Sequence, residues 1–131
     1  MDPRSAVSAY RESKYEGAPP IKIVHLMYEG ALRFLEQARR SDPLGQPAEF
    51  AQKLERAEAI VGELRLSLDP AHAPELVEKL NALYLFIEDR IQTARLERSA
   101  EPLAAAERVL ATLLEGWMGI ELDPASRAGP A

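Results

Sequence analysis

The sequence predicts an all-α protein, an antiparallel up-down four-helix bundle preceded by an N-terminal arm. The first observation is a regular spacing of 27, 27 and 28 residues between four prolines, Pro20, Pro47, Pro74 and Pro102. Proline suits the first turn of a helix and is excluded from its interior, so each proline is expected to open a helix. The second observation is a composition of 21 Ala and 18 Leu among 131 residues, which favours helices. Helices of near-equal length on short connections must double back on one another.

The expected helices span residues 20–40, 47–68, 74–96 and 102–119. Two arginines in the last turn of the first helix suit its dipole, and Asp-Pro pairs stop the first and second helices. The chain is long enough for one domain. We therefore expect an arm over residues 1–18, a four-helix bundle over 19–120 and a disordered tail over 121–131.

The apolar spacing predicts the core face of each helix. Helix 47–68 carries a seam with steps of four and three residues, formed by Phe50, Leu54, Ala57, Val61, Leu64 and Leu68. Helix 74–96 has one apolar face, formed by Leu76, Val77, Leu80, Leu83, Tyr84, Ile87, Ile91 and Ala94. Helix 102–119 offers Leu103, Ala106, Leu110, Leu113, Leu114 and Trp117. Apolar residues cover more than half the circumference of helix 20–40, which predicts packing from several sides.

Several apolar residues remain after the core faces are assigned. Leu66 lies opposite the seam of its helix, Leu85 and Leu96 lie opposite the core face of theirs, and Phe86 flanks that face. Single exposed leucines are normal in soluble proteins, but a group of them together with an apolar arm suggests a surface that meets another chain. The candidate partner-binding residues are Tyr10, Tyr15, Leu66, Leu85, Phe86 and Leu96.

The sequence offers little for catalysis, so we expect a protein that is not an enzyme. It has no cysteine, no Gly-rich phosphate loop and no nucleophile elbow. Its two histidines are His25, expected at the exposed edge of the first helix, and His72 in a loop. Neither follows a Glu at the spacing of di-metal bundles, so neither a metal nor another cofactor is expected. A phosphotransfer bundle that uses His25 is the remaining enzyme-like alternative.

The charge pattern limits the kinds of partner. The net charge is −5 and no stripe of Lys or Arg is visible, which argues against nucleic acid. No apolar run approaches the 20 or so residues that span a bilayer, and the N-terminus lacks the pattern of a signal peptide. We therefore expect a cytoplasmic protein that does not insert into membranes.

Several motifs resemble those of the flagellin-specific export chaperones, the FliS family. Residues 27–35, Met-Tyr-Glu-Gly-Ala-Leu-Arg-Phe-Leu, are similar to the first core helix of that family. Tyr10 stands 18 residues before Tyr28, where the family has an N-terminal Tyr-Gln-Gln, and residues 57–68 resemble its Ala-x-x-Ile-Ile-x-Glu-Leu motif. The likeness continues with Leu-Tyr-Leu-Phe-Ile at 83–87 and with Trp117. Departures are found at Leu85, Asp89, Arg90, Arg95 and in the arm.

The resemblance implies a protein that holds the disordered C-terminal segment of flagellin, prevents its premature polymerisation and delivers it to an export gate component. It also implies that the arm covers part of the client surface, with Tyr10 and Tyr15 on apolar residues of the bundle. Structural roles are expected for Tyr28, Gly30, Phe34, Tyr84 and Trp117. An adaptor or homo-oligomeric module for another helical client is the alternative, and a homodimer is left open.

Overall fold

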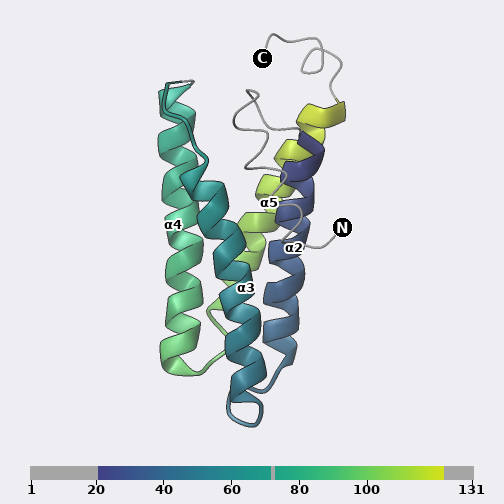
Figure 1. Ribbon diagram of the computed structural model, residues 1–131, viewed down its shortest axis with the longest axis vertical. Helices are drawn as coiled ribbons and strands as arrows, with labels where there is room; N and C mark the ends of the chain where they lie inside the picture. The colour runs from purple at the N-terminus through teal and green to yellow at the C-terminus, as the bar shows by residue number, and fades with distance from the viewer. Residues whose placement is uncertain (1–20, 72, 123–131) are drawn as a thin grey trace.

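A computed structural model describes residues 21–71 and 73–122 of the chain. The described residues form four helices, α2 (Ile21–Arg40), α3 (Pro47–Leu66), α4 (Pro74–Glu97) and α5 (Leu103–Leu122), and contain no strand (Figure 1). Successive helices run in opposite directions and lie side by side. The predicted all-α four-helix bundle is therefore confirmed.

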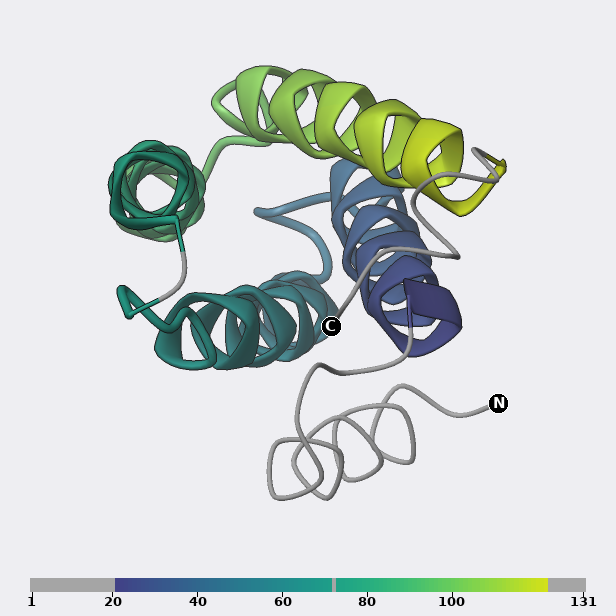
Figure 2. The same ribbon diagram turned by 90° about the horizontal axis from the view of Figure 1, so that it is seen from above.

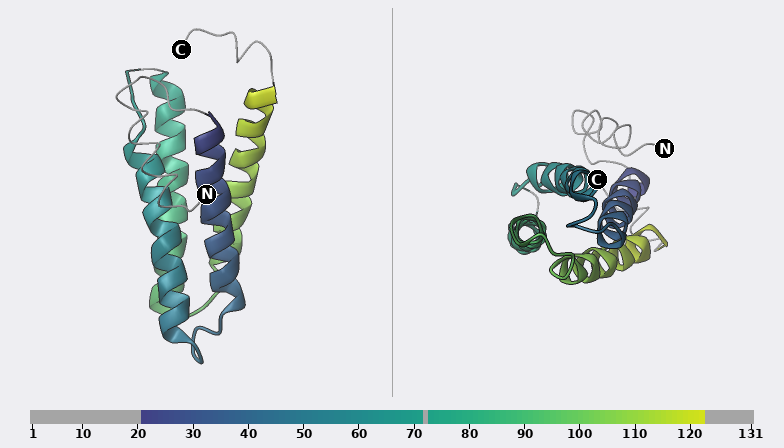
Figure 3. Two further views of the ribbon diagram at one scale, coloured as in Figure 1. Left: turned by 45° about the vertical axis from the view of Figure 1, so that its right-hand side comes forward. Right: turned by 90° about the horizontal axis from the view of Figure 1, so that it is seen from below.

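The helices follow chain order around a ring. Helix α2 packs beside α3 and α5, and α4 packs beside the same two helices from the opposite corner. The view along the bundle shows this square arrangement directly (Figure 2), and the views in Figure 3 show it from the side and from the other end. The start of α2 and the end of α5 lie at the same end of the bundle.

The helix ends follow from local chemistry. Pro47 and Pro74 are the first residues of α3 and α4, as the proline spacing predicts. Helix α3 ends at Leu66, two residues earlier than expected, where the hydroxyl of Ser67 donates to the carbonyl of Leu64 at 2.8 Å. A serine hydroxyl that bonds the backbone in this way competes with continuation of the helix.

Helix α4 is flanked by two non-glycine residues with positive φ. Ala73 precedes it with φ 54° and Arg98 follows it with φ 52°. The N–H of Arg98 donates to the carbonyl of Ala94, and the N–H of Ser99 reaches the same carbonyl at 3.1 Å. A left-handed residue at this position is a common way to end a helix, although glycine usually fills it.

The core is built mainly from the predicted faces. The seam of α3 is buried from Phe50 to Leu64, with Ile60 added, and Leu68 is partly buried beyond the end of the helix. On α5, Leu103, Ala106 and Leu110 are buried, while Leu113, Leu114 and Trp117 pack against the core from a partly buried position. Helix α2 is covered from two sides, by α3 and by α5, as its wide apolar arc predicts.

Two placements differ from the expectation. Leu76 belongs to the predicted core face of α4 but is 54% exposed, because it is the third residue of the helix and lies in its first turn, near one end of the bundle. His25 was expected at an exposed edge but is buried, with 8% of its surface exposed. The neighbours on both sides of α2 leave less of its circumference open than the sequence suggests.

The expected structural aromatic residues meet inside the bundle. The hydroxyls of Tyr28 on α2 and Tyr84 on α4 are hydrogen-bonded, and both side chains are buried. Their ring centroids are 6.4 Å apart, and the ring of Trp117 on α5 lies 6.5 Å from that of Tyr28. Phe34 and Gly30 are also buried. The tyrosine pair thus joins helices at opposite corners of the ring.

Candidate partner-binding surface

Helix α4 carries most of the exposed apolar side chains. Leu85 and Leu96 are both exposed, and they are 11 residues apart. Eleven residues make just over three turns, so the two leucines lie on the same side of α4, about 16 Å apart along its axis. This side faces away from the core residues Tyr84 and Ile87. The two leucines therefore form an apolar stripe on the outside of the bundle.

Phe86 lies on another side of α4, about 100° around the helix from Leu85. Its ring is partly covered by Arg90, whose guanidinium carbon is 5.8 Å from the ring centroid. Arg90 is itself held by Asp89, with 2.7 Å between Nη2 and Oδ2. Phe86 still exposes 41% of its surface, so a partner that contacts it also meets the Arg90 and Asp89 charge pair.

Leu66 is exposed on α3, near the connection to α4. The structure thus exposes all four bundle residues proposed for the surface but divides them among three helix sides. Tyr10 and Tyr15 lie outside the described residues.

Two further exposed leucines were not predicted from the sequence. Leu76 was assigned to the core, and Leu44 was not considered, although its place between Pro43 and Gly45 in a turn indicates exposure.

Two ion pairs hold α4 against α3 beside the stripe. Arg65 Nε lies 2.6 Å from Glu88 Oε2, and Arg95 Nη2 lies 3.0 Å from Glu58 Oε1. The partners are seven residues apart on each helix and occur in opposite order, so both pairs fit one antiparallel register. The hydrogen bond from Arg65 to Glu88 raises the pKa of the guanidinium. The contact between α3 and α4 therefore combines a buried apolar core with two ion pairs nearer the surface.

A further ion pair joins α2 to α5. Arg39 Nε lies 2.8 Å from Glu107 Oε2. Burial raises the pKa of the Glu107 carboxyl above its ordinary value, and the neighbouring Arg39 opposes this change without cancelling it. The carboxylate is thus less favourable in this position than in water.

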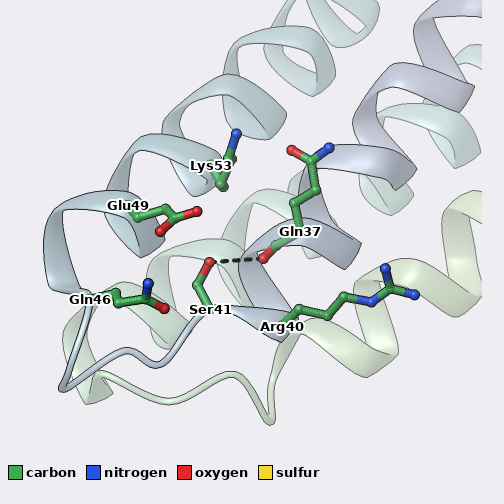
Figure 4. Close-up of a pocket in the computed structure, with 6 residues that line it drawn as sticks. All are labelled: Gln37, Arg40, Ser41, Gln46, Glu49 and Lys53. Atoms are coloured by element: carbon green, nitrogen blue, oxygen red, sulfur yellow. Dashed lines mark hydrogen bonds between the residues drawn. The ribbon is translucent and has the colours of Figure 1, made fainter.

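One polar pocket lies between the end of α2 and the start of α3, with a volume of about 290 Å³. Figure 4 shows the residues that line it, which are Gln37, Arg40, Ser41, Gln46, Glu49 and Lys53. The Ser41 hydroxyl donates to the Gln37 carbonyl at 3.0 Å, so it caps the helix end. The lining residues contain no histidine or cysteine that could activate a nucleophile.

Neither a metal centre nor a membrane span is found in the part of the chain that the structure describes. No group of three or more His, Cys, Asp or Glu side chains gathers there. Its helices also lack the length and hydrophobicity to cross a bilayer. The burial of His25 removes the exposed imidazole on which the phosphotransfer alternative depends. The class defined by the fold and its surface is a helical bundle with exposed apolar side chains along one outer helix.

Comparison with known proteins specifies the family. Residues 3–124 match the sequence model of the family described as "Flagellar protein FliS". The chain is 29% identical over 109 residues to the flagellar secretion chaperone FliSB of Pseudomonas aeruginosa, an alignment that covers 83% of this chain and 86% of that protein. It is also 29% identical over 120 residues to the flagellar secretion chaperone FliS of Campylobacter jejuni, which covers 89% of this chain and 91% of that protein. The chain belongs to the FliS family, as the motifs predict.

Proposed function

We propose that this protein is a flagellar export chaperone that acts in the cytoplasm. Its client is the C-terminal segment of flagellin, which it keeps from polymerising before delivery to an export gate component. Family membership supports the role, since two relatives are named flagellar secretion chaperones. The role is one of binding rather than of catalysis.

The observation that carries the proposal is the apolar stripe on α4. The bundle has a complete core, with Tyr84, Ile87 and Ile91 of α4 buried in it, yet Leu85 and Leu96 remain in water. An amphipathic helix of a disordered client can lay its apolar side along such a stripe. Ordering the client costs several kcal/mol, so the complex can be specific and still release its client.

The test is calorimetric binding of a purified flagellin C-terminal fragment to the full chain and to Leu96→Ser. Burying one leucine contributes about 1.5–3 kcal/mol, so the variant is expected to bind at least about tenfold more weakly. Leu44→Ser is the matched control, because Leu44 and Leu96 are both 73% exposed but Leu44 lies in the turn between α2 and α3. Equal affinity of both variants would exclude the stripe as the client site.

A second measurement concerns the biological effect. The chaperone is expected to delay seeded polymerisation of flagellin at equimolar ratio, and Leu96→Ser is expected to delay it less. Light scattering on the free protein reports the oligomeric state. A stable homodimer that buries the α4 stripe and does not bind flagellin would favour the homo-oligomeric alternative.

A further inference from the structure

Three cationic side chains converge on one buried aromatic ring between α2 and α3. The guanidinium carbon of Arg33 lies 6.0 Å from the ring centroid of Phe34, Lys53 Nζ lies 5.8 Å from it, and the guanidinium carbon of Arg56 lies 5.6 Å from it. Arg33 comes from α2, whereas Lys53 and Arg56 lie one turn apart on α3. We call Arg33, Lys53 and Arg56 the Phe34 cation cluster.

The cluster differs from the other arginines that face a neighbouring helix. Arg39, Arg65 and Arg95 each form an ion pair with a glutamate of that helix. Among the residues that the structure describes, no carboxylate lies within ion-pair distance of the three cluster cations. Phe34 attracts each cation through its ring, but the ring carries no net charge.

Like charges that share one ring repel one another, since they lie within about one Debye length at physiological ionic strength. This local gathering of positive charge contrasts with the net charge of −5 of the whole chain. Arg33 and Arg56 are exposed, so an approaching anion can reach them, while Phe34 itself is only 7% exposed. An anion placed over the cluster would relieve the repulsion and form charge-assisted hydrogen bonds.

The cluster borders the polar pocket at the end of α2. Lys53 lines that pocket together with Glu49 and Gln37, which come from the facing helices α3 and α2 (Figure 4). The Arg40 side chain points away from Lys53 in this view and pairs with Glu36. The pocket therefore adds the amide of Gln37 beside the cluster, together with one carboxylate, that of Glu49, which disfavours an anion close to it.

We propose that the Phe34 cation cluster is a docking site for an acidic segment of a partner protein. Charge complementarity selects this occupant. A polynucleotide needs a longer row of cations to track its phosphates. Three cations within 6.0 Å of one centroid instead match a few carboxylates of a peptide. The site goes beyond the proposed client binding, because it lies on α2 and α3 and the stripe lies on α4.

The experiment measures fluorescence anisotropy of a labelled oligoglutamate peptide with the full chain at low ionic strength. The cluster variant combines Arg33→Gln, Lys53→Gln and Arg56→Gln. The control variant combines Lys22→Gln, Lys79→Gln and Arg108→Gln, which removes the same charge at exposed sites elsewhere. We expect about tenfold or greater weakening in the cluster variant alone, since each exposed pair contributes a modest amount. Added salt should weaken binding to the parent protein.

Four outcomes would overturn the proposal: no binding of oligoglutamate, equal weakening in both variants, equally tight cluster-dependent binding of oligothymidylate, or a dimer in light scattering that the cluster variant abolishes. If the cluster variant does not fold, the single exchange Arg56→Glu replaces it, with Arg108→Glu as its control. Binding of the flagellin fragment is measured in parallel and should be unchanged in the cluster variant. Failure of this site is thereby separable from failure of the chaperone role.

Discussion

Helices α2 and α4 occupy opposite corners of the same ring, yet they distribute their apolar residues differently. Over residues 22–40, whose burial the structure describes, helix α2 buries nine residues, including His25 and Gly30, and exposes no large hydrophobic residue. Helix α4 buries five of its 24 residues and carries four of the six exposed large hydrophobic residues described. Each helix packs beside α3 and α5. The difference indicates that α2 holds the bundle together, whereas α4 also presents apolar surface.

The largest expected effect is the difference in stability between a variant at a buried position of α2 and a variant at an exposed position of α4. Leu35→Ala on α2 removes a fully buried side chain and should lower the free energy of unfolding by about 2–5 kcal/mol. Leu85→Ala on α4 should change it by less than about 0.5 kcal/mol. Chemical denaturation followed by Trp117 fluorescence measures both, with native emission expected to be blue-shifted and to move to the red on unfolding. A similar loss for both variants would contradict the assignment of α4 as the surface helix.

The next effect concerns the glycine that α2 buries. Gly30→Leu should destabilise the protein by about 1–3 kcal/mol, because a large side chain must fit into a packed site. Gly62→Ala on α3 is the matched control, since its new methyl would meet Glu88 Oε1 at an ordinary 3.7 Å. That exchange should be neutral or stabilise by up to about 1 kcal/mol through helix propensity. An unchanged denaturation midpoint for Gly30→Leu would show that the site has unfilled space.

A smaller effect tests how firmly α4 is held. A double-mutant cycle with Arg65→Gln and Glu88→Gln should give a coupling free energy of about 0.2–1 kcal/mol that decreases with salt, as for other partly exposed ion pairs. The Arg95 and Glu58 pair should behave alike. Coupling that salt does not change would mean that α3 and α4 are held together here by packing around these side chains rather than by their charge.

The smallest effect is a pH dependence on the α2 side. Because burial raises the pKa of Glu107 in the folded protein, the folded state binds this proton more tightly than the unfolded state does. Stability contributed by this group should therefore increase as the pH falls from neutral through the raised pKa towards the ordinary value of 4.5. Parallel thermal unfolding of the parent and Glu107→Gln measures it: the parent should gain stability relative to the variant on acidification. A relative loss would show that the bridge to Arg39 outweighs burial.

The sequence allowed the fold class, the helix starts and most core positions to be predicted, because proline sites and apolar spacing are local signals. The core assignment of Leu76 is wrong. The spacing correctly predicts which side of the helix faces the core, but it does not tell how far the neighbouring helices extend along that side. His25 was assigned wrongly for the converse reason, since the cover on α2 depends on helices that are distant in the chain. The Phe34 cation cluster was not visible, because Arg33 and the pair Lys53 and Arg56 meet only after α2 and α3 pack together.

The positive φ values of Ala73 and Arg98 give α4 a particular relation to the rest of the chain. At both ends of this helix the backbone turns through a conformation that costs a side-chain-bearing residue about 1 kcal/mol or more and costs glycine little. Glycine or asparagine at either position would relieve this cost without touching the stripe, the ion pairs or the core. The two residues are therefore sites for protein engineering: they allow the stability of the surface helix to be increased while its outer side chains stay the same.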